Sequence, residues 1–167
     1  MNKNMKRNIL LITILIILNG CTTLKYKSIP DNYTGPLARV TDSYEKLSGN
    51  RVYFFELEKA DGRVIRTSST VTHEYNLGKD SNTMARRISR KVPAGTTTLT
   101  ITGVNHMAPI IPVFLSDYYS ISGEITVDLE EDMHYYVKGI LSKKYSAIWL
   151  EDADGNIISR KIEENNH

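Results

Sequence analysis

Apolar and polar side chains alternate with a period of two along much of the chain. In residues 51–59, one face carries Tyr53, Phe55 and Leu57, and the other carries Val52, Phe54 and Glu56. The first face is the more apolar, so it is predicted to look into a core. Residues 96–104 alternate in the same way, as do Ile125, Val127 and Leu129 in the stretch that starts at Gly123. No stretch after residue 21 keeps a helical period over three turns, so the pattern predicts β-strands.

Turn motifs separate the predicted strands. Asp61-Gly62 and Asp154-Gly155 are each typical of a hairpin tip, because Asp and Gly tolerate a positive φ. Pro93-Ala94-Gly95 and residues 130–132 also indicate turns. Short strands with a turn signal about every 8–12 residues are typical of sandwiches and barrels. The chain is therefore predicted to be all-β, an antiparallel β-sandwich of about seven or eight strands, with its topology left open.

The apolar run at residues 9–18 follows a different pattern. A membrane-spanning helix needs about 20 apolar residues, so this run is too short to be one. Lys3, Lys6 and Arg7 precede it, and a basic segment followed by a short apolar segment is typical of a secretory signal peptide. The run ends in Leu18-Asn19-Gly20-Cys21. The alternative is an N-terminal strand or helix with an incidental cysteine.

Residues 18–21 resemble the lipobox of bacterial lipoproteins. The resemblance implies cleavage between Gly20 and Cys21, and acylation of Cys21 by two or three chains. Two or more chains anchor a protein stably to a bilayer surface, whereas one anchors it only marginally. Thr22 follows the cysteine, where an aspartate would mark retention in the inner membrane. The resemblance therefore implies the periplasmic face of the outer membrane, with the inner membrane as the less favoured location.

These signals divide the chain into four parts. Residues 1–20 are predicted to be a removed signal peptide, and residues 21–36 a lipidated N-terminus and tether. Residues 37–162 are predicted to form the β-sandwich, and residues 163–167 a disordered tail.

Charge and cysteine content narrow the function. Without residues 1–20, the 21 Lys and Arg of the full chain fall to 18 against 19 Asp and Glu, so the net charge is −1. This argues against nucleic-acid binding and leaves no broad basic field for an anionic membrane. Cys21 is the only cysteine, so a mature domain with this residue acylated has neither a disulfide nor a free thiol.

The candidate chemistry does not indicate an enzyme, a metal site or a cofactor. The four histidines, at positions 73, 106, 134 and 167, lack metal-ligand spacing. Residues 151–156 echo a calcium loop, but the glycine comes too early and Lys161 stands where the final glutamate belongs. No Gly-x-Ser-x-Gly motif occurs.

Two regions are candidate partner surfaces. Residues 67–83 form a long polar connection with His73 and Tyr75, and such loops are often functional. Residues 107–115 are apolar and contain Pro109, Ile110, Pro112 and Phe114. An exposed patch of this kind would bind a partner; the alternative is a buried crossover between the sheets.

A basic cluster occurs just before Pro93, at Arg86, Arg87, Arg90 and Lys91. On a strand, Arg86 and Arg90 share one face and Arg87 and Lys91 the other. Charge on both faces fits an edge strand. The alternative is a contact with anionic glycans or lipid headgroups.

Residues 30–43, 92–103, 123–139 and 147–155 together resemble a group of small proteobacterial envelope lipoproteins. "VPAG…LTI" and "MHYYVKG" are also similar to the ends of immunoglobulin- or transthyretin-like domains. The first resemblance brings no known activity, so it implies a location and a β fold only. The predicted function is a non-catalytic binding or structural module for an envelope protein or a glycan such as peptidoglycan. The alternative is a small periplasmic hydrolase or an enzyme inhibitor, and the oligomeric state is left open.

Overall fold

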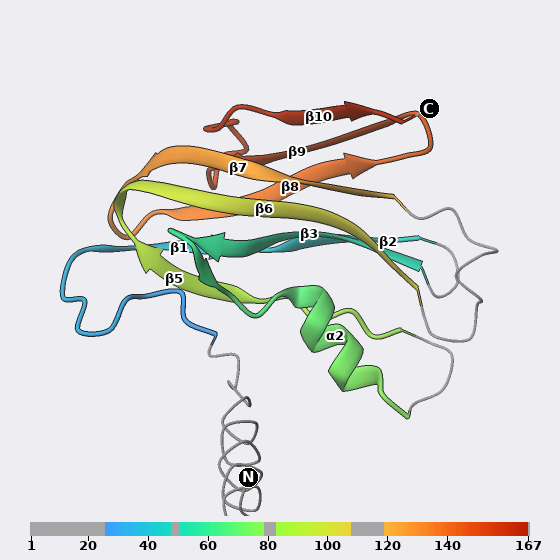
Figure 1. Cartoon of the computed structure of the whole chain (residues 1–167), viewed down its shortest axis with the longest axis horizontal. Helices are drawn as coiled ribbons and strands as arrows, with labels where there is room; N and C mark the ends of the chain where they lie inside the picture. Colours follow the sequence, from blue (N-terminus) through green and yellow to red (C-terminus); the bar gives the residue numbers. More distant parts are fainter. Residues whose placement is uncertain (1–25, 48–50, 79–82, 108–118, 167) are drawn as a thin grey trace, which may run out of the picture.

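The computed structural model describes residues 26–47, 51–78, 83–107 and 119–166, which form two packed β-sheets and a short helix (Figure 1). Sheet A has the order β10-β9-β8-β1-β5. Its strands are β1 (Leu37–Thr41), β5 (Ser89–Pro93), β8 (His134–Leu141), β9 (Tyr145–Glu151) and β10 (Ile162–Asn165). Sheet B has the order β2-β3-β6-β7, with β4 also paired to β3. Its strands are β2 (Ser43–Lys46), β3 (Arg51–Ala60), β4 (Arg63–Val64), β6 (Gly95–Met107) and β7 (Ser120–Leu129).

The predicted all-β sandwich is confirmed, with two differences in detail. The described residues contain ten strands, more than the seven or eight predicted. Three of them are short: β4 has two residues, and β2 and β10 have four each. One strand pair is parallel: β1 runs alongside β8, with Arg39 opposite His134. The resemblance to immunoglobulin or transthyretin domains stays a prediction.

The core lies between the two sheets and follows the predicted alternation. Tyr53, Phe55 and Leu57 belong to it, as do Ile125 and Val127 on β7. Asp61 and Gly62 have φ values of 46° and 75°, as the predicted β3–β4 hairpin turn requires. Gly95, with φ 90°, is the first residue of β6, directly after the chain leaves β5 of sheet A and enters sheet B.

The prediction of a disordered tail at residues 163–167 is wrong for the residues that are described. β10 pairs with β9 from Ile162 to Asn165. The Asn166 amide donates to Ser142 O at 2.8 Å and to Ser146 Oγ at 2.9 Å. A polar edge strand of this kind is held by backbone and amide hydrogen bonds, which leave no trace in the apolar pattern. His167 lies outside the described residues.

The polar connection at residues 67–83 contains a helix, α2 (Ser68–Asn76). Thr67 is its N-cap, and the Thr67 side chain accepts a hydrogen bond from Thr70 N. In Figure 1, α2 lies beside β5, at the side of the sandwich where the described chain begins.

Candidate functional site

A buried polar network lies where the chain crosses from sheet A to sheet B. β1 ends at Thr41 and β2 begins at Ser43, so Asp42 is the single residue between the sheets. The Asp42 side chain is fully buried, and the Arg90 side chain from β5 is nearly so. Arg90 Nη1 lies 2.5 Å from Asp42 Oδ1, and Nη2 lies 2.7 Å from Oδ2. The pair is therefore bidentate, the geometry in which guanidinium and carboxylate bind most strongly.

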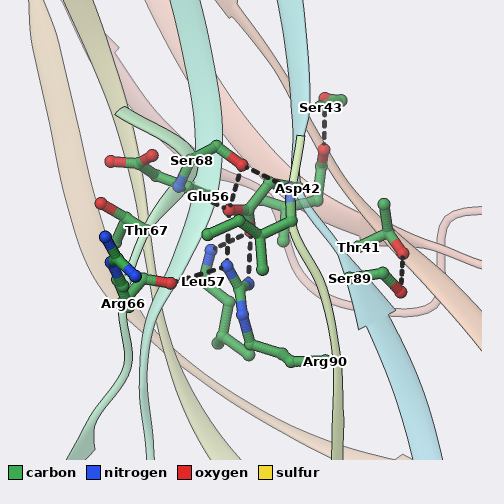
Figure 2. A network of polar contacts seen from close by, with 12 residues as sticks. Thr41, Asp42, Ser43, Glu56, Leu57, Arg66, Thr67, Ser68, Ser89 and Arg90 are labelled. Atoms are coloured by element: carbon green, nitrogen blue, oxygen red, sulfur yellow. Dashed lines mark hydrogen bonds and ion pairs between the residues drawn. The ribbon is translucent and has the colours of Figure 1, made fainter. Parts of the chain in front are cut away.

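Asp42 also binds two other parts of the chain (Figure 2). Leu57 N donates to Oδ1 at 2.9 Å, where β3 extends past the end of β2. Ser68 N and Ser68 Oγ donate to Oδ2 at 3.0 and 2.7 Å. One carboxylate thus joins β3, β5 and the first turn of α2. A buried charge needs such additional hydrogen bonds, because its desolvation costs several kcal/mol.

A second buried carboxylate, Glu56, binds the same end of α2. Glu56 is 4% exposed, and it accepts from Ser69 N at 2.9 Å and from Ser69 Oγ at 2.7 Å. Burial raises the pKa of Glu56 to about 7, and the negative charge of Asp42 adds to the rise, although the bonds from Ser69 oppose it. The hydrogen bonds from Ser68 and Ser69 therefore tie the first turn of α2 to both acidic side chains.

One face of α2 is bound to the extended segment that leads into β5. Met84 N donates to Asn76 Oδ1 at 3.0 Å, Arg86 N to Thr72 Oγ1 at 2.8 Å, and Ile88 N to Ser68 Oγ at 2.9 Å. Alternate residues of the segment therefore meet residues four apart on the helix, which share one face. We call these six residues the α2 clasp. The spacing of Ser68, Thr72 and Asn76 is the signal by which this helix is found in the sequence, and a search for apolar periodicity misses it.

The α2 clasp places a group of aromatic, imidazole and guanidinium side chains together. We call this group the α2 surface; it comprises His73, Tyr75, Arg86, Arg87, His106 and Tyr44. The rings of His73 and His106 are 6.1 Å apart and meet edge to face. Arg86 lies over the Tyr75 ring at 3.7 Å, and Arg87 over the Tyr44 ring at 5.3 Å. Burial, and to a lesser degree the neighbouring His73, lowers the pKa of His106.

The predicted partner surface is only partly described. His73 is exposed on α2 and Tyr75 is half-buried. The contact of His73 with His106 on β6 is not foreseen by the sequence pattern, which places His106 only at the end of a strand. Pro109, Ile110, Pro112 and Phe114 lie outside the described residues, as do Gly20 and Cys21. β6 ends at Met107, one residue after His106 of the α2 surface.

The predicted edge strand is confirmed, because β5 is the last strand of sheet A. The prediction that Arg86 and Arg90 share a strand face is wrong, since β5 begins only at Ser89. Lys91 is exposed on β5, whereas Arg90 points inward to Asp42. A buried arginine inside a basic run has no local signal, because its partner lies 48 positions earlier.

His134 lies where β1 pairs with β8, and both of its ring nitrogens face hydroxyl groups. His134 Nε2 lies 2.6 Å from Thr41 Oγ1, and His134 Nδ1 lies 3.3 Å from Tyr136 OH. Burial, and then the charge of Arg39, lowers the pKa of His134. Within the described part of the chain, no group of three or more His, Cys, Asp or Glu residues is arranged to hold a metal ion.

A groove of about 300 Å³ opens beside Arg90. It is lined by residues from the start of the described chain, from the β4–α2 connection, from α2, and from β5 and the residue before it: Tyr26, Ser28, Ile65, Arg66, Val71, Ile88 and Arg90. The described chain thus begins against the open edge of the sandwich.

Comparisons with protein-family models, with curated proteins and with solved structures find no match. None of the described helices has the length and apolar character needed to cross a membrane.

Proposed function

We propose that this protein is a lipid-anchored lipoprotein of the bacterial cell envelope, acylated at Cys21, and that it binds another envelope component without catalysis. The favoured location is the periplasmic face of the outer membrane. The lipobox-like Leu18-Asn19-Gly20-Cys21 supports the anchor. The α2 surface supports the binding role.

The α2 surface has the composition of a recognition site. Tyrosine and arginine are enriched in protein interfaces, where rings bury area and guanidinium groups bind acceptors. The clasp and the two buried carboxylates hold α2 in place, so its exposed side chains are organised before a partner arrives. Such preorganisation lowers the entropic cost of binding. The binding partner is an envelope protein or a glycan such as peptidoglycan.

The proposed anchor predicts a covalent modification of Cys21 that mass spectrometry can detect. Native protein should lack residues 1–20 and carry diacylglycerol on Cys21, seen by mass spectrometry of the N-terminal peptide. Cys21→Ser should lose the lipid and leave the membrane fraction, because the sulfur that accepts the acyl chains is gone. Thr23→Ser, close by, should be acylated normally. An unprocessed N-terminus or a free thiol in native cells would refute the anchor.

The binding role predicts contact at one face of the domain. A photo-crosslinker placed at His73 in the acylated protein should react with an envelope protein or with sacculi, and one placed at Lys143 should not. Arg87→Glu should abolish the product at position 73, because it reverses a charge on the α2 surface, whereas Lys144→Glu should leave it unchanged. Equal reaction at positions 73 and 143 would contradict the assignment of this surface.

A further inference from the structure

The described chain begins at the open edge of the sandwich, between β4 and β5. Lys27 N donates to Val64 O at 3.1 Å, and Tyr26 lines the groove with Ile65 and Arg90. Tyr26 is five residues after Cys21, and five residues span at most about 18 Å when fully extended. A bilayer that holds acyl chains on Cys21 therefore lies within that distance of the β4–β5 edge.

Charge is divided between the two sides of the sandwich, although the net charge is close to zero. Residues 26–107, with β1 to β6, contain 12 Lys and Arg against 8 Asp and Glu, a net charge of +4. Residues 119–166, with β7 to β10, contain 5 against 10, a net charge of −5. Both sheets place β7–β10 on one side, as Figure 1 shows in orange and red, and the described chain begins on the other. The net charge of the mature chain hides this separation.

The excess positive charge near the anchor is not neutralised within the described part of the domain. Five cations in the described part of residues 26–107 form ion pairs: Lys27 with Asp31, Lys59 with Glu58, Arg63 with Asp61, Arg66 with Glu74, and the buried Arg90 with Asp42. Lys91, on the edge strand β5, is exposed and lies directly opposite the exposed Arg39. Like charges opposite each other across two strands destabilise a sheet, so this pair lowers stability unless an anion lies nearby. Arg86 and Arg87, which precede β5, add two further exposed cations.

We propose that the β4–β5 edge lies against the anionic phospholipid headgroups of the membrane that holds the anchor, with the acidic β7–β10 side turned away. The proposal rests on the lipid anchor proposed above and adds an orientation to it. Lys and Arg side chains near an anionic bilayer are attracted to its surface, and the anchor keeps Lys91 and Arg39 within reach of that surface. A partner bound at the α2 surface then meets the domain close to the bilayer.

The test uses full-length acylated protein in vesicles that contain a headgroup-attached nitroxide lipid. Acylation leaves no free thiol, so a single introduced cysteine carries a fluorophore: Met84→Cys beside β5, or Ile157→Cys in the turn after β9. These side chains are similarly exposed, at 55% and 46%. In phosphatidylglycerol-containing vesicles, quenching at position 84 should exceed that at 157 by about twofold or more, and the difference should shrink in 1 M salt, where screening is nearly complete. Vesicles of phosphatidylcholine alone should show a smaller difference.

A matched pair of charge reversals separates this proposal from non-specific attraction. Arg39→Glu with Lys91→Glu should abolish the difference, while Lys143→Glu with Lys144→Glu, the same charge change between β8 and β9, should keep it. Equal quenching at both positions in wild-type protein that floats with the vesicles overturns the orientation alone. Protein that fails to float because Cys21 carries no lipid overturns the proposed anchor instead. If a charge-reversed variant does not fold, the salt series on wild-type protein still tests the orientation, because a quenching difference that is unchanged in 1 M salt would contradict an electrostatic contact.

Discussion

Replacing Asp42 with alanine should destabilise the domain by about 3–5 kcal/mol, the cost of leaving a buried charge without its partner. Arg90 would keep its buried guanidinium, and Ser68 and Leu57 would lose their common acceptor. Denaturant unfolding in detergent measures the loss. Trp149, the only tryptophan and 9% exposed, reports the transition by its fluorescence.

The double variant Asp42→Ala with Arg90→Met is the control for charge. It should recover a large part of the lost stability, since replacing both members of a buried pair is far less costly than removing one. Hydrogen exchange should still show faster opening of α2 in the double variant, because Ser68 loses its acceptor in both. If the single variant loses less than about 1 kcal/mol, a value typical of exposed pairs, the network does not hold the sheets and helix together as described.

The stability of the domain should fall as the pH rises from about 4.5 to 7, because Glu56 must then ionise in a buried place. Its pKa is raised from 4.5 to about 7 by burial, so the folded state binds this proton more tightly than the unfolded state does. The stabilisation is fully present below pH 4.5 and is lost as the pH passes through 7. At about 1.4 kcal/mol for each pKa unit, the loss amounts to roughly 3 kcal/mol.

Glu56→Gln should remove this contribution, because the amide cannot ionise and can still accept from Ser69 N. The difference in unfolding free energy between wild type and variant, measured from pH 4 to 8.5, should slope only between the two pKa values. Glu164→Gln, at an exposed site on β10, should keep the wild-type slope. A constant difference over the whole range would mean that Glu56 stays ionised in the folded protein.

The strands were predictable because one face of each is buried and the other is not. Leu99, Ile101, Ile125 and Val127 are all in the core, and Asp61-Gly62 forms the expected turn. The parallel pairing of β1 with β8 was not predictable, since a strand carries the same alternation whichever direction its neighbour runs.

The helix and the buried carboxylates were missed for a single physical reason. The face that α2 buries is polar, with Ser68, Thr72 and Asn76 bonded to backbone amides, so no apolar stripe marks it. Its N-terminus is held by Asp42 and Glu56, which lie 26 and 13 positions before their serine partners. Local sequence carries no record of such pairings. His73 and Tyr75 could be selected by residue type, but His106, Arg87 and Tyr44 join them only through the fold.

The parallel pair has a consequence for how the chain is made. β1 can pair with β8 only after β8 has been synthesised, and His134, the residue opposite Arg39, lies 95 positions after it. The middle of sheet A therefore cannot close during synthesis until most of the polypeptide has emerged. Such long-range pairing slows folding. A chain that folds slowly stays unfolded for longer, and only an unfolded chain can be threaded through a narrow translocation channel. The signal peptide proposed above would require the chain to cross a membrane unfolded, and slow folding would favour that step. A circular permutant that starts at β8 should fold faster.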